Sequence, residues 1–150
     1  MPRDNARQAL VRMQARREHS VREIKAKLTQ KGHEPSAVTE ALEFAKRHDL
    51  QNDMRYAKSQ ARTLAGRKGD RVVSSRLKAQ GIDRETQAVA LEQLAPEQER
   101  ALRLLARFEG QPVDAALRSK AWRFLLGRGF SGRAIESAWR VFTGKEDFSG

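Results

Sequence analysis

The sequence has no cysteine, and its 150 residues include only four prolines and nine aromatic side chains of Phe, Trp and Tyr. Without cysteine the chain forms neither disulfides nor thiolate metal sites. No apolar stretch approaches the roughly 18 residues needed to span a bilayer. The first ten residues also lack the hydrophobic core of a secretory signal. We therefore expect a cytoplasmic protein with no membrane partner.

Residue patterns for catalysis and cofactor binding are also missing. The three histidines, His19, His33 and His48, are 14 and 15 residues apart, with no carboxylate at ligand spacing. The pair Gly66 and Gly69 lacks the G-x-x-x-x-G-K-[ST] spacing of a phosphate-binding loop, and no G-x-S-x-G nucleophile motif occurs. The sequence thus predicts a binding protein without a metal or other cofactor, rather than an enzyme.

The chain does contain one pattern that occurs three times. Gly32, Gly81 and Gly129 are separated by 49 and 48 residues, and mostly apolar residues recur at matching distances from each glycine. The matching positions are Leu28, Val38, Ala41 and Leu42 in the first copy, Leu77, Gln87, Ala90 and Leu91 in the second, and Leu125, Ile135, Ala138 and Trp139 in the third. A unit repeated at this period buries its apolar face mainly against its neighbours, so the pattern predicts an elongated array with one long surface.

Each of these glycines is expected to end a helix, because glycine adopts the positive φ that follows a helix at no steric cost. Two residues after the second and third glycines stand Asp83 and Ser131, which are strong N-caps. Pro35, after the first glycine, fits a first helical position. A second helix therefore begins just beyond each glycine.

Further capping signals place the other helices. Ser20 and Glu23 form a capping box for one helix, Asp70 is predicted to cap another, and Pro96 with an acidic first turn opens a third. No segment alternates apolar and polar residues long enough to indicate a strand. We predict an all-α fold of three tandem three-helix repeats, about nine helices in an elongated array. The units span residues 1–51, 52–95 and 96–143, followed by a flexible tail at 144–150.

Positive charge is in excess along the whole chain. Thirty Lys and Arg against nineteen Asp and Glu give a net charge of +11. The excess is +4, +3 and +4 in successive thirds of 50 residues. Such an even distribution indicates a polyanion, or an assembly that contains one, contacted along the array rather than at a single pocket.

The strongest basic run extends from Arg55 to Lys78 in the second unit and contains eight Lys and Arg but the single acid Asp70. Such a run is often only a solvated helix face, but this one crosses a helix, a turn and a second helix without changing sign. Tyr56, beside it, is a candidate for stacking on a base. The basic residues are Arg55, Lys58, Arg62, Arg67, Lys68, Arg71, Arg76 and Lys78. Their spacing suits phosphate contacts, which carry salt-dependent affinity and little sequence preference.

A second basic patch lies near the first turn, with Glu18 and Glu23 interleaved. It comprises Arg16, Arg17, Arg22, Lys25, Lys27 and Lys31, of which Arg16, Arg17, Lys25 and Lys31 are the candidate contacts. The two tryptophans, Trp122 and Trp139, occupy apolar stripes, so we expect them in the core rather than against bases.

Four motifs together resemble a known family. They are Arg17-Glu-His-Ser20 with the helix that follows it, Asn52-Asp-x-Arg55-Tyr56-Ala57, Leu77-x-x-x-Gly81-Ile82, and Lys120 to Phe124 followed by Arg128-Gly129-Phe130-Ser131. In order, spacing and length these motifs resemble the RecX family of bacterial recombination regulators, over roughly residues 6–142.

The resemblance implies three tandem three-helix repeats that bind the RecA recombinase and lie in the groove of its filament on single-stranded DNA. It also implies inhibition of ATP hydrolysis, strand exchange and the coprotease activity that triggers the SOS response. The expected partners are therefore the RecA filament and single-stranded DNA, with non-specific duplex binding left open, and the expected state is a monomer. Asp70 departs from the family, where this position is more often proline or basic, and argues against a phosphate contact there.

A helix-turn-helix-like DNA-binding protein without a recombinase partner is the alternative, because helix, glycine turn and helix follow one another in each unit. Each copy uses its apolar residues for packing, however, and none offers an exposed recognition helix rich in Asn, Gln, Arg and Ser. The repeat and the charge thus favour a polymer-binding regulator.

Overall fold

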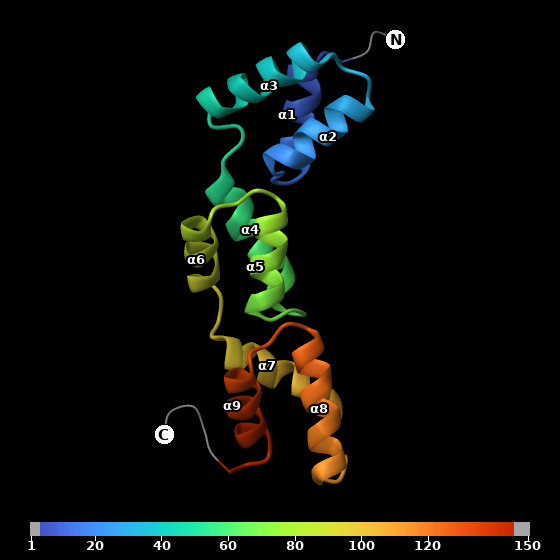
Figure 1. The fold of residues 1–150 in the computed structure, drawn as a ribbon, viewed down its shortest axis with the longest axis vertical. Helices are drawn as coiled ribbons and strands as arrows, with labels where there is room; N and C mark the ends of the chain where they lie inside the picture. Colours follow the sequence, from blue (N-terminus) through green and yellow to red (C-terminus); the bar gives the residue numbers. More distant parts are fainter. Residues whose placement is uncertain (1–3, 146–150) are drawn as a thin grey trace.

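The computed structural model describes residues 4–145, and all regular secondary structure in this part of the chain is helical, as the sequence predicts. Nine α-helices and one short 3-10 turn follow one another between residues 4 and 145 (Figure 1). In chain order they are α1 (Ala6–Arg16), α2 (Val21–Gln30), α3 (Pro35–Arg47), α4 (Asp53–Ala65), α5 (Asp70–Ala79), α6 (Arg84–Glu92), α7 (Glu97–Leu105), η1 (Ala106–Phe108), α8 (Ala115–Gly127) and α9 (Gly132–Phe142). The tail predicted at 144–150 lies, from residue 146 on, outside the described residues.

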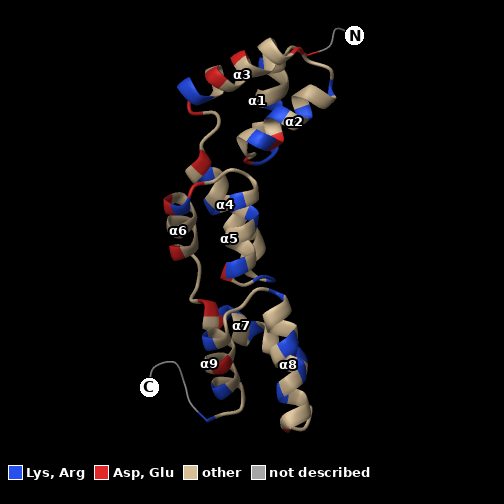
Figure 2. Cartoon of the chain, in the orientation of Figure 1, with Lys and Arg blue, Asp and Glu red and all other residues tan. Residues whose placement is uncertain are grey.

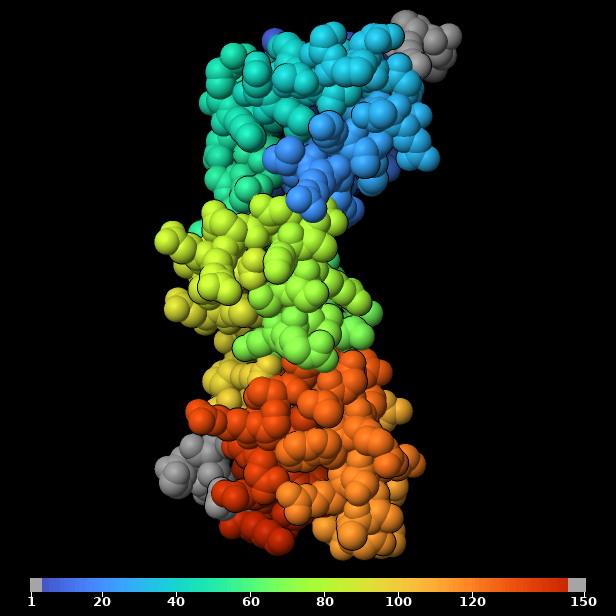
Figure 3. Space-filling view, in the orientation of Figure 1, coloured from blue at the N-terminus to red at the C-terminus, as the bar shows by residue number. Residues whose placement is uncertain are grey.

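Each group of three helices encloses its own hydrophobic core. Leu10 and Ile24 lie in the core of unit one (α1 to α3), Val73 in that of unit two (α4 to α6), and Phe130 and Trp139 in that of unit three (α7 to α9). The space-filling view shows the units as successive bodies along one long axis (Figure 3). The tandem three-helix arrangement and its elongated shape are thus confirmed, whereas the unit limits at 51, 95 and 143 stay a prediction.

The three repeated glycines form the same corner in each unit. Gly32, Gly81 and Gly129 have φ values of 88°, 78° and 95°, which confirms that each ends a helix in the left-handed region. In every copy the N–H of the next residue donates to the carbonyl of a buried leucine five residues back. These bonds run from His33 to Leu28 at 3.1 Å, from Ile82 to Leu77 at 3.1 Å, and from Phe130 to Leu125 at 3.2 Å.

The predicted helix starts are confirmed except at one position. The side chains of Asp83 and Ser131 accept from backbone N–H groups at 2.8 and 3.1 Å, and Ser20 with Glu23 forms the capping box. Asp70, however, is not an N-cap. Gly69 occupies that position without a side-chain cap, and the Asp70 carboxylate turns away to an arginine of unit three.

Units two and three meet backbone to backbone. The N–H of Gly69 donates to the carbonyl of Arg128 at 2.9 Å, and the N–H of Arg71 donates to that of Gly129 at 3.2 Å. A Cβ on Gly69 would overlap the backbone of Gly129 and Phe130. Only a residue without a side chain allows this approach, which explains why glycine stands between two basic residues and an acid at this turn.

A buried arginine fixes the same junction. Arg100 of α7 is 4% exposed, and its guanidinium donates to the carbonyls of Ala95 and Lys68 at 3.0 Å each and to the carboxylate of Asp70. Burial raises the pKa of Asp70, with Glu97 adding to the effect and Arg100 opposing it. Because each of the three guanidinium nitrogens of Arg100 bonds to unit two or to its linker, these contacts fix the position of α7 against α5.

Glu97 joins the starts of two further helices. One carboxylate oxygen accepts from the N–H of Asp70 at 2.7 Å, and the other accepts from the hydroxyl of Ser131 at 2.7 Å and from its N–H at 3.2 Å. The N-termini of α5, α7 and α9 therefore converge on two carboxylates. Negative charge is favourable there because helix N-termini carry unpaired N–H groups and partial positive charge.

Units one and two meet through side chains instead. The Ser20 hydroxyl donates to the Gln80 side chain at 2.6 Å, and Arg22 donates to the carbonyl of Ala79 at 2.5 Å. Arg55 of α4 bonds Glu18, in the loop between α1 and α2, at 3.0 Å. This first junction is thus polar and mediated by long side chains.

Replacing Gly69 by alanine should destabilise the protein by about 1–3 kcal/mol, the cost of forcing atoms into a packed site. Gly66→Ala is the matched control, because a Cβ there meets nothing within 4 Å and its φ of −75° suits alanine. Urea unfolding followed by circular dichroism measures both variants. Equal stability of the two variants would contradict the backbone contact.

Arg100→Ala should cost about 1–3 kcal/mol, because it removes the hydrogen bonds to the carbonyls of Ala95 and Lys68 and leaves the half-buried Asp70 carboxylate without its partner. Both tryptophans, Trp122 and Trp139, lie in unit three, so their fluorescence reports this unit alone. We expect the fluorescence transition in urea to precede the circular-dichroism transition in the variant but not in the parent. Arg103→Ala, an exposed position on the same helix, should leave the two transitions coincident.

Candidate cationic interface

The second helices of the three units, α2, α5 and α8, meet end to end. At the carboxyl end of α5, Ala79 and Gln80 contact the start of α2, as described above. At its amino end, Arg71 donates to the carbonyl of Leu126 in α8 at 3.3 Å. In Figure 1 these helices follow one another along the right side of the array. We call α2, α5 and α8 the second-helix file; its 33 helical residues correspond to about 50 Å of helix.

The net charge of a helix depends on its position within its three-helix unit. The second-helix file carries nine Lys and Arg, all exposed, against only two acids. Both acids are already bound, Glu23 by Arg17 at 2.7 Å and Asp70 by Arg100. One of the nine cations is also paired, since Arg118 bonds Glu136 of α9 at 2.8 Å. The nine cations are Arg22, Lys25, Lys27, Arg71, Arg76, Lys78, Arg118, Lys120 and Arg123. Figure 2 shows these helices with blue positions in every unit.

The third helices differ sharply from this file. Together α3, α6 and α9 carry five basic and five acidic residues, and Figure 1 shows them on the opposite side of the array. The array therefore has one cationic edge and one edge without net charge. An extended anionic polymer would be attracted to the first edge along its length.

Four of the residues predicted from sequence belong to the second-helix file: Lys25, Arg71, Arg76 and Lys78. The three basic residues of α8 were missed, because they do not continue the basic run of unit two. Grouping the charges by their distance from the repeated glycine would have placed them beside α2 and α5. The missed residues are Arg118, Lys120 and Arg123.

The predicted residues on α4 lie outside the file, and one of them is already occupied. Arg55 pairs with Glu18 at 3.0 Å and with Asp49 at 2.9 Å, so its guanidinium is already engaged within the protein. Arg62 donates to the Gln93 side chain at 2.8 Å. Arg62 lines a small cleft of about 260 Å³ with Arg100 and Arg103 of α7, and Lys58 is half-buried one turn earlier.

Arg67 and Lys68 lie in the turn between α4 and α5. Arg67 is exposed, Lys68 is half-buried, and their carbonyls accept from Arg128 and Arg100 at the second junction. The hydrogen bonds from Arg128 and Arg100 therefore fix the backbone of this turn, while the Arg67 side chain is exposed to solvent.

Tyr56 is not available for stacking, so that prediction is wrong. The residue is 3% exposed and belongs to the core of unit two. Burial, together with the charge of Glu23 and a hydrogen bond to it, raises the Tyr56 pKa to about 12. Trp139, by contrast, lies in the core of unit three as expected, with Trp122 packed against it.

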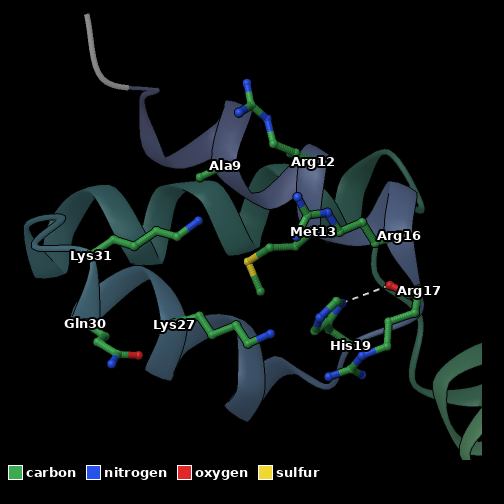
Figure 4. Close-up of a pocket in the computed structure, with 9 residues that line it drawn as sticks. All are labelled: Ala9, Arg12, Met13, Arg16, Arg17, His19, Lys27, Gln30 and Lys31. Atoms are coloured by element: carbon green, nitrogen blue, oxygen red, sulfur yellow. Dashed lines mark hydrogen bonds between the residues drawn. The ribbon is translucent and has the colours of Figure 1, made fainter. Parts of the chain in front are cut away.

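The basic residues of unit one surround a cleft of about 660 Å³ between α1 and α2 (Figure 4). Three of the predicted residues, Arg16, Arg17 and Lys31, line it. Lys25 does not; it lies on another side of α2, near Glu43. The cleft also includes Ala9, Arg12, Met13, His19, Lys27 and Gln30.

His19 closes the inner end of this cleft. Its ring is buried, and Nδ1 lies 2.8 Å from the carbonyl of Arg17. Burial lowers the pKa of His19, and the positive charges of Arg17 and Lys27 lower it further. The neutral ring is thus favoured, because the cleft already concentrates positive charge.

Between residues 4 and 145 there is no group of three or more His, Asp and Glu placed to hold a metal ion. Within the same residues, every helix is too short or too polar to cross a bilayer.

Comparison with known proteins agrees with this architecture. Residues 6–44 match the family model for the first three-helix domain of RecX, and residues 52–91 match that for the second. A crystal structure of RecX from Lactobacillus salivarius superposes with a TM-score of 0.77 at 23% identity, covering 92% of this chain and 94% of that one. This likeness supports the fold.

Two sequence relatives share a higher identity with this chain than that structure does. The regulatory protein RecX of Chromohalobacter salexigens is 34% identical over 140 residues, covering 91% of this chain and 90% of the relative. That of Herbaspirillum seropedicae is 35% identical over 133 residues, covering 87% and 86%. The repeat, the fold and these relatives show that the chain belongs to the RecX family of regulatory proteins.

Proposed function

We propose that this protein is a non-catalytic regulator that binds the RecA recombinase and its filament on single-stranded DNA. In this proposal it acts in the cytoplasm as a monomer and inhibits ATP hydrolysis, strand exchange and the SOS coprotease activity. Membership of the RecX family supports the regulatory role. The observation that carries the mode of binding is the second-helix file, with nine exposed cations spread over three units.

The file suits a filament because it offers contacts at successive points. Each unit alone presents only three cations on its second helix, and an exposed ion pair contributes little. Three linked units act together, since binding of one raises the effective concentration of the others. The cations would meet DNA phosphates or acidic groups of the recombinase, and would bridge neighbouring protomers.

Such bridging gives a physical route to inhibition. A rigid array that spans neighbouring protomers opposes any change in their spacing or orientation. The closed state that ATP hydrolysis requires and the addition of further protomers would both be disfavoured. The backbone contact and the buried Arg100 at the second junction supply this rigidity between units two and three.

Sequence-specific DNA binding is less well supported. The helix after each glycine turn would be the recognition helix, yet α3, α6 and α9 together carry no net charge. On α6 the exposed charged side chains are one cation, Arg84, and two acids, Glu85 and Glu92. Non-specific contact through the charged edge fits the distribution better.

Reversing one lysine on each helix of the file, Lys25→Glu, Lys78→Glu and Lys120→Glu together, should weaken inhibition of DNA-dependent ATP hydrolysis by RecA. We expect the concentration for half-inhibition to rise at least about tenfold, equivalent to about 1.4 kcal/mol. All three side chains are exposed, so helicity should be unchanged.

The matched control reverses one cation on each third helix: Lys46→Glu, Arg84→Glu and Arg133→Glu. It changes the net charge equally, yet it should shift half-inhibition by less than about threefold because exposed charges away from an interface contribute little. Equal effects of the two triple variants would show that net charge, not the file, determines binding. Unchanged inhibition by the file variant would reject this surface.

A further inference from the structure

The cleft between α1 and α2 has two cationic walls and an apolar floor. Arg12 and Arg16 stand four residues apart on α1, and Lys27 lies on α2 with Lys31 four residues beyond it. Residues spaced by four share a helix face, so the two pairs face each other across the cleft. Ala9 and Met13 form the buried floor (Figure 4).

The cations of this cleft are not neutralised from within. No acidic residue lines it. Arg12 pairs with Asp4 at 2.8 Å, and Arg17 pairs with Glu23. In the part of the chain that the structure describes, Arg16, Lys27 and Lys31 have no ion-pair partner. Three like charges around one hollow repel each other, and an anion from outside would relieve that repulsion.

His19 adds a hydrogen-bond acceptor at the inner end. The carbonyl of Arg17 can only accept, so the Nδ1 atom, 2.8 Å away, carries the proton. The Nε2 atom of the neutral ring is then an acceptor, and it has no partner among the described residues. Figure 4 shows the ring facing the space between Met13 and Lys27. A ligand with an N–H donor would satisfy this atom.

The size of the cleft decides what kind of anion it fits. About 660 Å³ lies within the roughly 300–1,000 Å³ of small-molecule sites and far exceeds the volume of a lone phosphate. We propose that the cleft binds one nucleotide, with its phosphate between Arg16, Lys27 and Lys31. Its base lies on Ala9 and Met13, with a polar edge at His19.

This inference deepens the proposed function, on which it rests, by naming a strand-binding site in unit one. Lys27 belongs both to the cleft and to the second-helix file. A single strand that follows the file would therefore reach the cleft at the end of its path. The same chemistry is offered by a free nucleotide, and the experiment separates the two sources.

Methyl NMR tests the site directly, because the chain has only three methionines. The methionine methyl groups are isotopically labelled. Met13 lies in the floor of the cleft, and Met54, in α4 of unit two, is an internal reference. Oligothymidylate of eight nucleotides, thymidine monophosphate and inorganic pyrophosphate are titrated separately into the 150-residue protein. We expect the oligomer to shift the Met13 methyl and His19 ring signals and to leave Met54 unchanged.

Each titration has a defined meaning. Tighter binding of the oligomer than of the monophosphate supports a strand site, and equal binding assigns the cleft to a free nucleotide. An unmoved Met13 signal with both would overturn the proposal. Pyrophosphate that reproduces the shifts would also overturn it, because the base would then play no part.

A second measurement uses Arg16→Ala, Lys27→Ala and Lys31→Ala together, compared with Lys46→Ala, Arg84→Ala and Arg133→Ala. Fluorescence anisotropy should show at least about tenfold weaker oligomer binding for the cleft variant and less than about threefold for the control. Equal losses would reject the cleft.

RecA inhibition, assayed in parallel, separates this proposal from the broader one. A protein that does not inhibit RecA at all, yet shifts Met13 with the oligomer, would reject the proposed function and keep the cleft. An inhibitor whose Met13 signal never moves would reject only the cleft.

Discussion

The close approach of Gly69 and Gly129 is the constraint on which the long surface of this protein depends. A glycine corner of unit three lies directly against the start of α5, and two backbone hydrogen bonds cross between them. Because no side chain separates the two backbones, α8 follows α5 without a gap, and their cations form one edge. Arg100 and Glu97 then fix the angle, since their charged groups bind the starts of neighbouring helices. The repeated corner ends a helix in every unit. In unit two it also contacts unit one through side chains, and in unit three it contacts unit two through the backbone.

The two junctions differ in their chemistry. The second combines a backbone contact with a guanidinium that is almost fully buried. The first consists of side-chain contacts, of which that of Ser20 is buried and those of Arg22 and Arg55 are exposed or half-exposed. Exposed ion pairs are weak and are screened by salt. Units two and three therefore behave as the more rigid pair, while unit one is attached through contacts that ionic strength can weaken. The same unit carries the cationic cleft between α1 and α2.

The repeat was predictable because it depends on local rules. A glycine with positive φ, a buried leucine before it and an Asp or Ser after it leave a recognisable pattern, and the structure reproduces it at Gly81 and Gly129. Asp70 misled the prediction because an acid after a turn resembles a cap, while its true partner, Arg100, lies 30 residues away. The interface was harder to predict for a similar reason. Arg55 and Arg71 belong to one basic run in the sequence, so the prediction grouped them. In the structure Arg55 forms ion pairs within the protein, whereas Arg71 lies on the exposed second-helix file. Tyr56 likewise stands beside basic residues in sequence and inside the core in space.

The charge balance of the third helices has a consequence for crowded fibres. A protein that binds a fibre through α2, α5 and α8 turns α3, α6 and α9 outward, and these helices carry equal numbers of acids and bases. A decorated fibre would then present an outer coat with little residual attraction for other polyanions. Many copies could then cover one filament without linking it to the next.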